Sequence, residues 1–293
     1  MRVFNLAFLR KNFIKLCLTS YVFITLILIL ILLSIPNKFT SVGIYAPAEH
    51  LQGDGLSGLA GSLGGLAGLA GLNLNTSKRD SLQIALEIAK SKKFLFNLIE
   101  NEDIKAKVFA VKEWDKETNT LIYNEKIYDA QTNTWVRDEP EPEPTTFEVY
   151  KVLKDNLTIN FDEKNTLVKI SYVHVSPQFS YWLVSKIEKT LNSVLKERNI
   201  NDAKISIELL ENSATTTSNI DLKGLLYELV EEQTKKLLLA QSRQYYILEP
   251  IDPPIVPEEK STPKRGLILI SFTFVYFLIS ALILVYFRSH DKE

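Results

Sequence analysis

The sequence PIDPPIVPEEKSTPKR, residues 250–265, decides how this chain is organised. It holds five of the eleven prolines and leads directly into an apolar segment without charges, residues 266–287. Proline fixes φ and lacks a backbone N–H, so residues 250–264, hereafter the proline-rich run, cannot form an interior helix or a central strand. We therefore predict a stiff, extended connection between a folded domain and a membrane span.

A second apolar segment without charges lies near the N-terminus, at residues 16–37. At about 1.5 Å per residue each segment covers roughly 33 Å, which is enough to cross the hydrocarbon core of a bilayer. A cleaved signal peptide is the alternative for the first segment. Its apolar run is longer than a signal-peptide core, however, and SIPN at residues 34–37 is not a small-x-small cleavage site. We expect transmembrane helices at 16–37 and 266–287.

Basic residues indicate the orientation of these spans. Four of them precede the first span with no acidic residue among them: Arg2, Arg10, Lys11 and Lys15. Cytoplasmic flanks carry an excess of such residues, which predicts a cytoplasmic N-terminus. Two spans return the C-terminus to the same side, so we expect cytoplasmic tails at 1–15 and 288–293. Residues 38–265 would then form one external domain.

The composition argues against a nucleic-acid partner and against disulfide bonds in the external domain. The net charge is −1, which gives no reason to expect a nucleic-acid partner. The single cysteine, Cys17, lies in the first expected span. An external domain without disulfides must be held together by packing or by assembly.

Motifs for catalysis and metal binding are missing from the sequence. The histidines, His50, His174 and His290, are far apart, and no Cys/His group has the spacing of a metal site. The glycine-rich segment lacks the Gly-Lys-Ser/Thr ending of a phosphate-binding loop, and neither Gly-x-Ser-x-Gly nor His-Glu-x-x-His occurs. We expect no enzyme activity and no cofactor.

Three tryptophans are spaced singly along the chain: Trp114, Trp135 and Trp182. Such side chains can stack on sugar rings, but packing in the core or in an interface is the preferred interpretation.

Residues 51–75 form a Gly/Leu-rich loop that contains eight of the eleven glycines. The absence of proline and a break in the triplet register exclude collagen, and repeated glycines disfavour a third membrane helix. Two interpretations remain open: a flexible loop, or a loop near the membrane whose leucines pack against lipid, the spans or a neighbouring subunit. The second involves Gly55, Leu56, Gly58, Leu59, Leu63, Gly65, Leu66, Gly68, Leu69 and Gly71.

A strand of the external domain is expected at 40–46, and alternating apolar and polar residues predict two more at 157–161 and 167–173. The last two would form a hairpin. Helical spacing predicts one or two helices over 80–99, whereas 104–135 should mix helical turns with loops.

A helical arm is expected at 177–243. Ser176 and Pro177 open it as N-cap and first helical residue, and a bend is expected near 215–218. Residues 202–212 also alternate like a strand, but a helix is preferred. One apolar face is expected to form an interface: Leu222, Leu225, Leu226, Leu229, Gln233 and Leu237. The chain then becomes a strand at 245–251 and enters the proline-rich run.

In this layout the sequence resembles the Wzz-type polysaccharide chain-length determinants, or polysaccharide co-polymerases. The family pattern Pro-x2-Pro-x4-Ser-Pro-Lys fits residues 254–264, with Thr262 where serine is usual. The matching positions, with the prolines before them, are Pro250, Pro253, Pro254, Pro257, Thr262, Pro263 and Lys264. Val275 stands where the family often has a glycine in the second span.

The resemblance implies an α+β fold. Two terminal transmembrane helices would enclose a periplasmic domain that has a small mixed sheet base and a long protruding helical arm. It also implies the kinase-free branch of the family, because neither a kinase nor a tyrosine-rich tail follows residue 287.

The implied function is non-enzymatic control of polysaccharide chain length in the bacterial inner membrane, with lipopolysaccharide O-antigen as the favoured polymer. The implied partners are other copies of the chain in a ring, the membrane polysaccharide polymerase and the lipid-linked polysaccharide. An adaptor for capsule or exopolysaccharide export, working with a separate kinase and an outer-membrane channel, is the alternative. A two-span sensor is a third reading.

Overall fold

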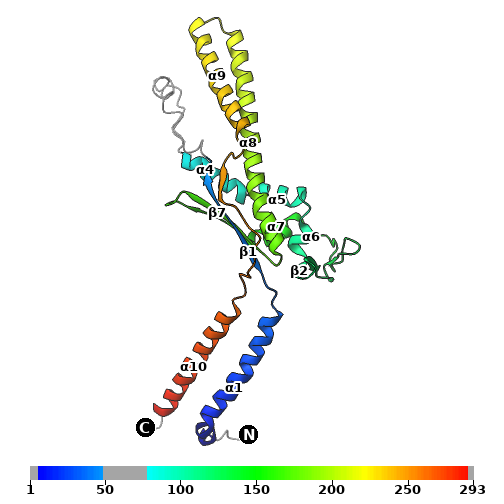
Figure 1. The fold of residues 1–293 in the computed structure, drawn as a ribbon, viewed down its shortest axis with the longest axis vertical. Coiled ribbons are helices and arrows are strands. Elements are labelled where there is room, and N and C mark those ends of the chain that lie inside the picture. Colours follow the sequence, from blue (N-terminus) through cyan, green and yellow to red (C-terminus); the bar gives the residue numbers. More distant parts are fainter. Residues whose placement is uncertain (1–5, 49–77, 290–293) are drawn as a thin grey trace. The chain divides into compact units, whose positions relative to one another are not determined.

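The computed structural model describes residues 6–48 and 78–289, so the Gly/Leu-rich loop lies outside the described residues (Figure 1). The chain divides into two units. One contains residues 1–39 and 258–293, and the other contains residues 40–257.

A four-stranded sheet forms the base of the second unit, in the order β6-β7-β1-β8. Its strands are β1 (Phe39–Pro47), β6 (Leu157–Asp162), β7 (Leu167–His174) and β8 (Leu248–Asp252). The predicted hairpin is confirmed: β6 and β7 are antiparallel, with Leu157 opposite Tyr172. Alternate residues of β1 and β7 are buried, as the period of two requires.

Short helices pack with this sheet around one apolar core. They are α4 (Lys78–Lys90), α5 (Lys92–Asn101), α6 (Lys105–Phe109) and α7 (Thr146–Asn156). Their boundaries follow from local capping. Ser91 accepts the N–H of Phe94 at the start of α5, and Thr145 and Glu148 form a reciprocal capping box at the start of α7.

Two long helices form the arm: α8 (Pro177–Thr216) and α9 (Ile220–Ser242). Ser176 caps α8 and Pro177 begins it, which confirms the predicted start. The 40 residues of α8 span about 60 Å, and its inner half packs on β7 (Figure 1). Residues 202–212 are helical, and the break falls at 217–219, where Asn219 caps α9.

The prediction of helical turns and loops for 104–135 was correct only for the short helix α6 and missed the strands. Beyond α6 this segment forms two antiparallel hairpins, β2 (Val111–Asp115) with β3 (Thr120–Tyr123), and β4 (Tyr128–Asp129) with β5 (Thr134–Trp135).

Both of these hairpins turn through the same sequence pattern, Asp-x-x-Thr-Asn-Thr, at residues 115–120 and 129–134. In each turn the aspartate accepts the hydroxyl of the first threonine, and the asparagine has φ of 54° or 52°. Asparagine tolerates this left-handed conformation, so the turns are locally encoded.

The first unit contains two helices, α1 (Leu6–Ser34) and α10 (Arg265–Ser289). Within them, Cys17–Ser34 and Arg265–Val285 are long and apolar enough to cross a membrane. The described chain is thus α+β, with an apolar helix near each end.

Candidate functional site

The proline-rich run begins inside strand β8. Pro250 lies opposite Tyr45 of β1, and β8 is an edge strand, so the missing N–H of Pro250 interrupts no ladder between two strands. Beyond Asp252 the run has no helix or strand up to Arg265, apart from one bridge at Thr262. Ser41 of β1 donates its hydroxyl to the carbonyl of Ile255 over 2.9 Å, which holds the run beside the sheet.

The end of the run is hydrogen-bonded to the segment that follows α1. The N–H of Lys38 donates to the carbonyl of Thr262 over 2.8 Å, and the N–H of Ser261 donates to the carbonyl of Lys38 over 2.8 Å. Arg265 donates Nη2 to the carbonyl of Ile35 over 2.9 Å. Because Thr262 is engaged here through its backbone, this bridge does not require a particular side chain at that position.

At the other end of the run, Asn192 of α8 holds the chain that enters β8. Its Oδ1 accepts the N–H groups of Tyr246, Ile247 and Leu248 over 3.1, 2.8 and 3.0 Å. Its Nδ2 donates to the carbonyl of Leu248 over 2.9 Å and to Oε1 of Glu188 over 2.6 Å. Asn192 is buried, so its amide replaces water for backbone groups that would otherwise lack partners.

Lys196, one helical turn further along α8, holds the end of α9. Its ammonium donates to the carbonyls of Gln241 and Arg243 over 3.1 and 2.7 Å. The last carbonyls of a helix have no partners within it, and a cation at that end also complements the helix dipole. Asn192 and Lys196 together fasten α8 to the end of α9 and to the start of β8.

A groove of about 470 Å³ lies between this face of α8 and the proline-rich run. Residues of α8 from Tyr181 to Lys196 line one side, and Tyr245 and the prolines Pro250, Pro253 and Pro254 line the other. Of the predicted motif, these three prolines thus come together in the groove. The remaining positions, Pro257, Thr262, Pro263 and Lys264, lie outside its lining.

Besides Asn192, the groove lining includes two buried residues with polar groups, Tyr45 and Glu188. Both residues are buried, and the hydroxyl of Tyr45 has no hydrogen-bond partner among the described residues. Burial raises the pKa of the Glu188 carboxyl, and it also raises the pKa of the Tyr45 hydroxyl, with a further contribution from the negative charge of Glu188. An unpartnered buried polar group costs about 1–3 kcal/mol, so the Tyr45 hydroxyl is a locally destabilising feature of the fold.

The predicted interface residues of the arm lie on α9. Leu222 is exposed, and the others are partly buried: Leu225, Leu226, Leu229, Gln233 and Leu237. Small residues, Ala203 and Ala214 on α8 and Ala240 on α9, are buried along the hairpin. The sequence analysis missed a set of exposed apolar residues on the arm: Ile205, Leu209, Tyr227, Leu238 and Leu239.

Hydrogen bonds join α1 and α10, which the sequence analysis did not anticipate. Tyr276 donates its hydroxyl to the carbonyl of Cys17 over 2.8 Å, and the hydroxyls of Tyr21 and Thr273 are 2.9 Å apart. The ring of Tyr21 also lies 5.2 Å, between centroids, from the ring of Phe277. Polar side chains facing a neighbouring span are the signal that could have found this contact.

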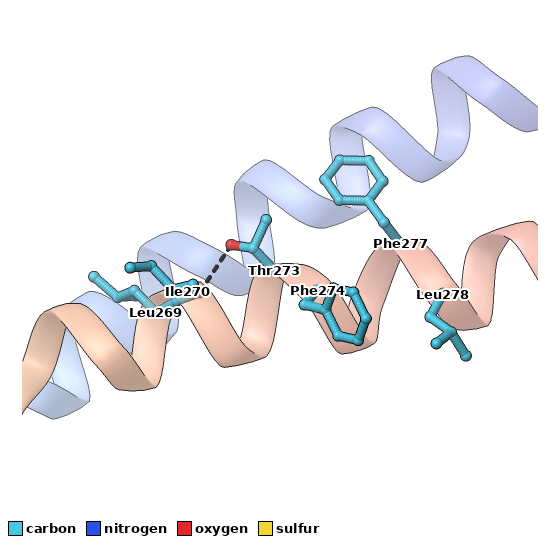
Figure 2. A pocket seen from close by; sticks show the side chains of 6 residues that line it. All are labelled: Leu269, Ile270, Thr273, Phe274, Phe277 and Leu278. Carbon is cyan, nitrogen blue, oxygen red and sulfur yellow. Dashed lines mark hydrogen bonds between the residues drawn. The ribbon is translucent and has the colours of Figure 1, made fainter.

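The side chains of α10 differ between the face toward α1 and the opposite face. Figure 2 shows Thr273 and Phe277 on the side of α10 nearer α1, whereas Phe274 and Leu278 point away from it. Together with Leu269 and Ile270 these side chains line a shallow apolar hollow.

The tryptophans and His174 make local contacts. The Trp135 ring lies 4.9 Å from that of Tyr128, and the Trp182 ring stacks on Phe179 at 5.5 Å. Nδ1 of His174 accepts the N–H of Ser176, and its Nε2 lies 2.9 Å from the carbonyl oxygen of Lys107. Among the described residues no three His, Cys, Asp or Glu side chains are grouped as metal ligands would be.

No protein-family model matches the sequence, and neither does any curated protein. Among solved structures, a full-length bacterial polysaccharide co-polymerase matches at 12% identity, covering 100% of this chain and 99% of that chain with a TM-score of 0.37. A fragment of WzzB, a polysaccharide co-polymerase from Salmonella Typhimurium, matches at 13% identity, covering 77% of this chain and 100% of that chain with a TM-score of 0.33. Both are polysaccharide co-polymerases, the family that the sequence resembles.

Proposed function

We propose that this chain is a polysaccharide co-polymerase, which controls polysaccharide chain length without catalysing a reaction itself. The observation that carries the proposal is the path of the proline-rich run. The run leaves an edge strand that Asn192 fastens to α8, and it reaches a helix apolar enough to cross a membrane.

The proposed setting is the bacterial inner membrane. Both termini would be cytoplasmic, and the domain 38–265 would lie in the periplasm. The basic residues before the first span support this orientation. Membrane helices at 16–37 and 266–287 would anchor the domain, and the bridge between Lys38 and Thr262 would join the two anchors where they leave the bilayer.

The proposed assembly is a ring of identical subunits around, or beside, the membrane polysaccharide polymerase, in contact with the lipid-linked polysaccharide. The exposed apolar residues of α8 and α9 support assembly, because such residues on a slender helical pair are costly in water. The predicted interface face of α9 and the Gly/Leu-rich loop would contribute to the same contacts. The favoured polymer is lipopolysaccharide O-antigen.

Deletion of the gene, followed by gel electrophoresis of the surface polysaccharide, tests the function. We expect the modal band of lengths to disappear and short chains to accumulate, with the modal band restored by a plasmid-borne copy. An unchanged ladder would refute control of O-antigen length. If capsule or exopolysaccharide export failed instead, the adaptor interpretation would replace it.

The size of the protein in detergent or nanodiscs tests the assembly. We expect a closed oligomer, and a monomer would favour the sensor interpretation. Cysteine crosslinking from positions 63 and 66 of the Gly/Leu-rich loop to a neighbouring subunit or span would support a packing role for that loop. Absence of such crosslinks would favour a free loop.

A further inference from the structure

The groove between α8 and the proline-rich run has the chemistry of a ligand site. One side is lined by residues from successive turns of α8, including Tyr181, Ser185 and Glu188. The other side is lined by Tyr245, Pro253 and Pro254. Most of the lining residues are polar, charged or tyrosine, so the groove offers a ligand many hydrogen-bond donors and acceptors.

The accessible polar groups indicate which ligand would fit. Tyr181 and Lys189 are exposed in the groove, and Asn192 engages one oxygen of the neighbouring Glu188 carboxyl. A ligand that offers several hydroxyl groups would supply donors and acceptors to these side chains and to the second carboxyl oxygen. The aromatic faces of Tyr181 and Tyr245 complement the C–H faces of a sugar ring.

Anions and peptides fit this groove less well. An anion would need a cationic side chain as its partner. Lys196 already donates to two carbonyl groups, and Lys189 stands beside the Glu188 carboxyl. A peptide that added a strand to the sheet would need the donors of edge strand β8, and Pro250 removes one of them. A neutral, hydroxylated ligand matches the lining better than either.

We infer that this groove binds an extended segment of the polysaccharide chain. The inference rests on the proposed function, because it takes the regulated polymer as the ligand. The polysaccharide would then lie between α8 and the proline-rich run. It would touch the run itself, which connects the domain to the second span.

Photocrosslinking in the polysaccharide-producing host tests this inference on the full-length protein. The photoreactive residue p-benzoylphenylalanine replaces Tyr245 in one strain and Tyr181 in another. A third strain carries it at Tyr227, an exposed tyrosine of α9 outside the groove, as the matched control. After irradiation the protein is purified under denaturing conditions and stained for periodate-oxidised carbohydrate.

We expect carbohydrate on the Tyr245 and Tyr181 variants, in a smear whose mass follows the length of the polymer, and none on the Tyr227 control. Ser185→Trp should fill the groove and lower the labelled fraction about tenfold, whereas Ser213→Trp, on the exposed outer part of α8, should leave it unchanged. Circular dichroism and oligomer size check that both tryptophan variants fold.

Three outcomes overturn the inference. In the first the groove variants carry no carbohydrate, in the second they form a crosslinked product with the mass of two protein chains, and in the third their mass increases by a small fixed amount that corresponds to a free sugar. These outcomes are separable from failure of the proposed function. A modal ladder that depends on the gene, together with unlabelled groove variants, refutes the groove alone. Labelled variants in a host whose ladder does not depend on the gene refute length control alone.

Discussion

Asn192 and Leu248 are joined by two hydrogen bonds, one in each direction. Oδ1 of Asn192 accepts the N–H of Leu248 over 3.0 Å, and Nδ2 donates to its carbonyl over 2.9 Å. A side-chain amide thus takes the place of a neighbouring strand at the start of β8. This contact connects the helical arm to the strand that continues into the proline-rich run.

Replacing this amide should destabilise the domain. Asn192→Ala leaves the N–H groups of Tyr246, Ile247 and Leu248 without their acceptor, and we expect a loss of about 3 kcal/mol. That corresponds to a fall of roughly 6–12 °C in Tm, measured by circular dichroism of the detergent-solubilised protein. Ser193→Ala, at the adjacent exposed position, is the control and should change Tm little. Equal Tm values for both variants would contradict a structural role for Asn192.

Gly43 and Gly224 should respond to alanine in opposite directions. A Cβ at Gly43 would lie 2.7 Å from Cζ of Tyr45, so the buried ring must shift, and we expect a loss of about 1–3 kcal/mol. A Cβ at Gly224 of α9 meets nothing within 4 Å, and alanine there should stabilise the helix by about 0.5–1 kcal/mol. Chemical denaturation of the two variants measures both effects. Similar changes in both would show that the space beside Tyr45 does not constrain residue 43.

The strands and helices that could be predicted are those whose signals are local. Alternation in 157–173 predicted the β6–β7 hairpin, and Ser176 with Pro177 predicted the start of α8. The hairpins within 111–135 were also locally encoded, but the repeated Asp-x-x-Thr-Asn-Thr turn was not recognised. The contact of Asn192 with Leu248 joins residues 56 positions apart, and no local pattern specifies such a pair. The only available signal was a polar residue on the apolar face of a helix.

Glu188 should make the stability of the domain depend on pH. Burial raises its pKa above the ordinary value of 4.5, so the folded protein holds this proton more tightly than the unfolded chain. The stabilisation is complete below pH 4.5 and is lost as the pH rises through the folded-state pKa. Glu188→Gln keeps an oxygen for Asn192 and cannot ionise. Its Tm should therefore rise relative to the wild type as the pH increases from about 4.5.

The comparison with the wild type isolates Glu188 from other titrating groups. Hydrogen bonds lower the pKa values of Asp115, Asp129 and Asp162, and a hydrogen bond from Arg137 lowers that of Glu148. These groups stabilise the fold above their ordinary pKa and lose that effect as the pH falls, but they do so equally in both proteins. A difference in Tm that stays constant from pH 4 to pH 8 would contradict the burial of an ionisable Glu188.

The hydroxyl of Tyr276 should stabilise the pairing of the two membrane helices. Tyr276→Phe keeps the ring but removes the hydrogen bond to the carbonyl of Cys17, and we expect a loss of about 0.6 kcal/mol, as is typical of hydrogen bonds between membrane helices. Unfolding in mixed micelles with increasing SDS measures the change. Tyr227→Phe makes the same chemical change on an exposed part of α9 and serves as the control. An equal effect of both variants would argue against a specific contact between α1 and α10.

The prolines themselves should matter for length control rather than for folding. Alanine at Pro254, Pro257 and Pro263 removes three fixed φ angles without removing any backbone donor, so the run becomes more flexible. If the run transmits position between the domain and the second span, the triple variant should give a broadened polysaccharide ladder at normal expression and membrane insertion. The double variant Pro140→Ala, Pro142→Ala changes two exposed prolines elsewhere in the domain and should leave the ladder intact. A sharp ladder from the triple variant would mean that the run only tethers the domain, and that length control does not depend on its stiffness.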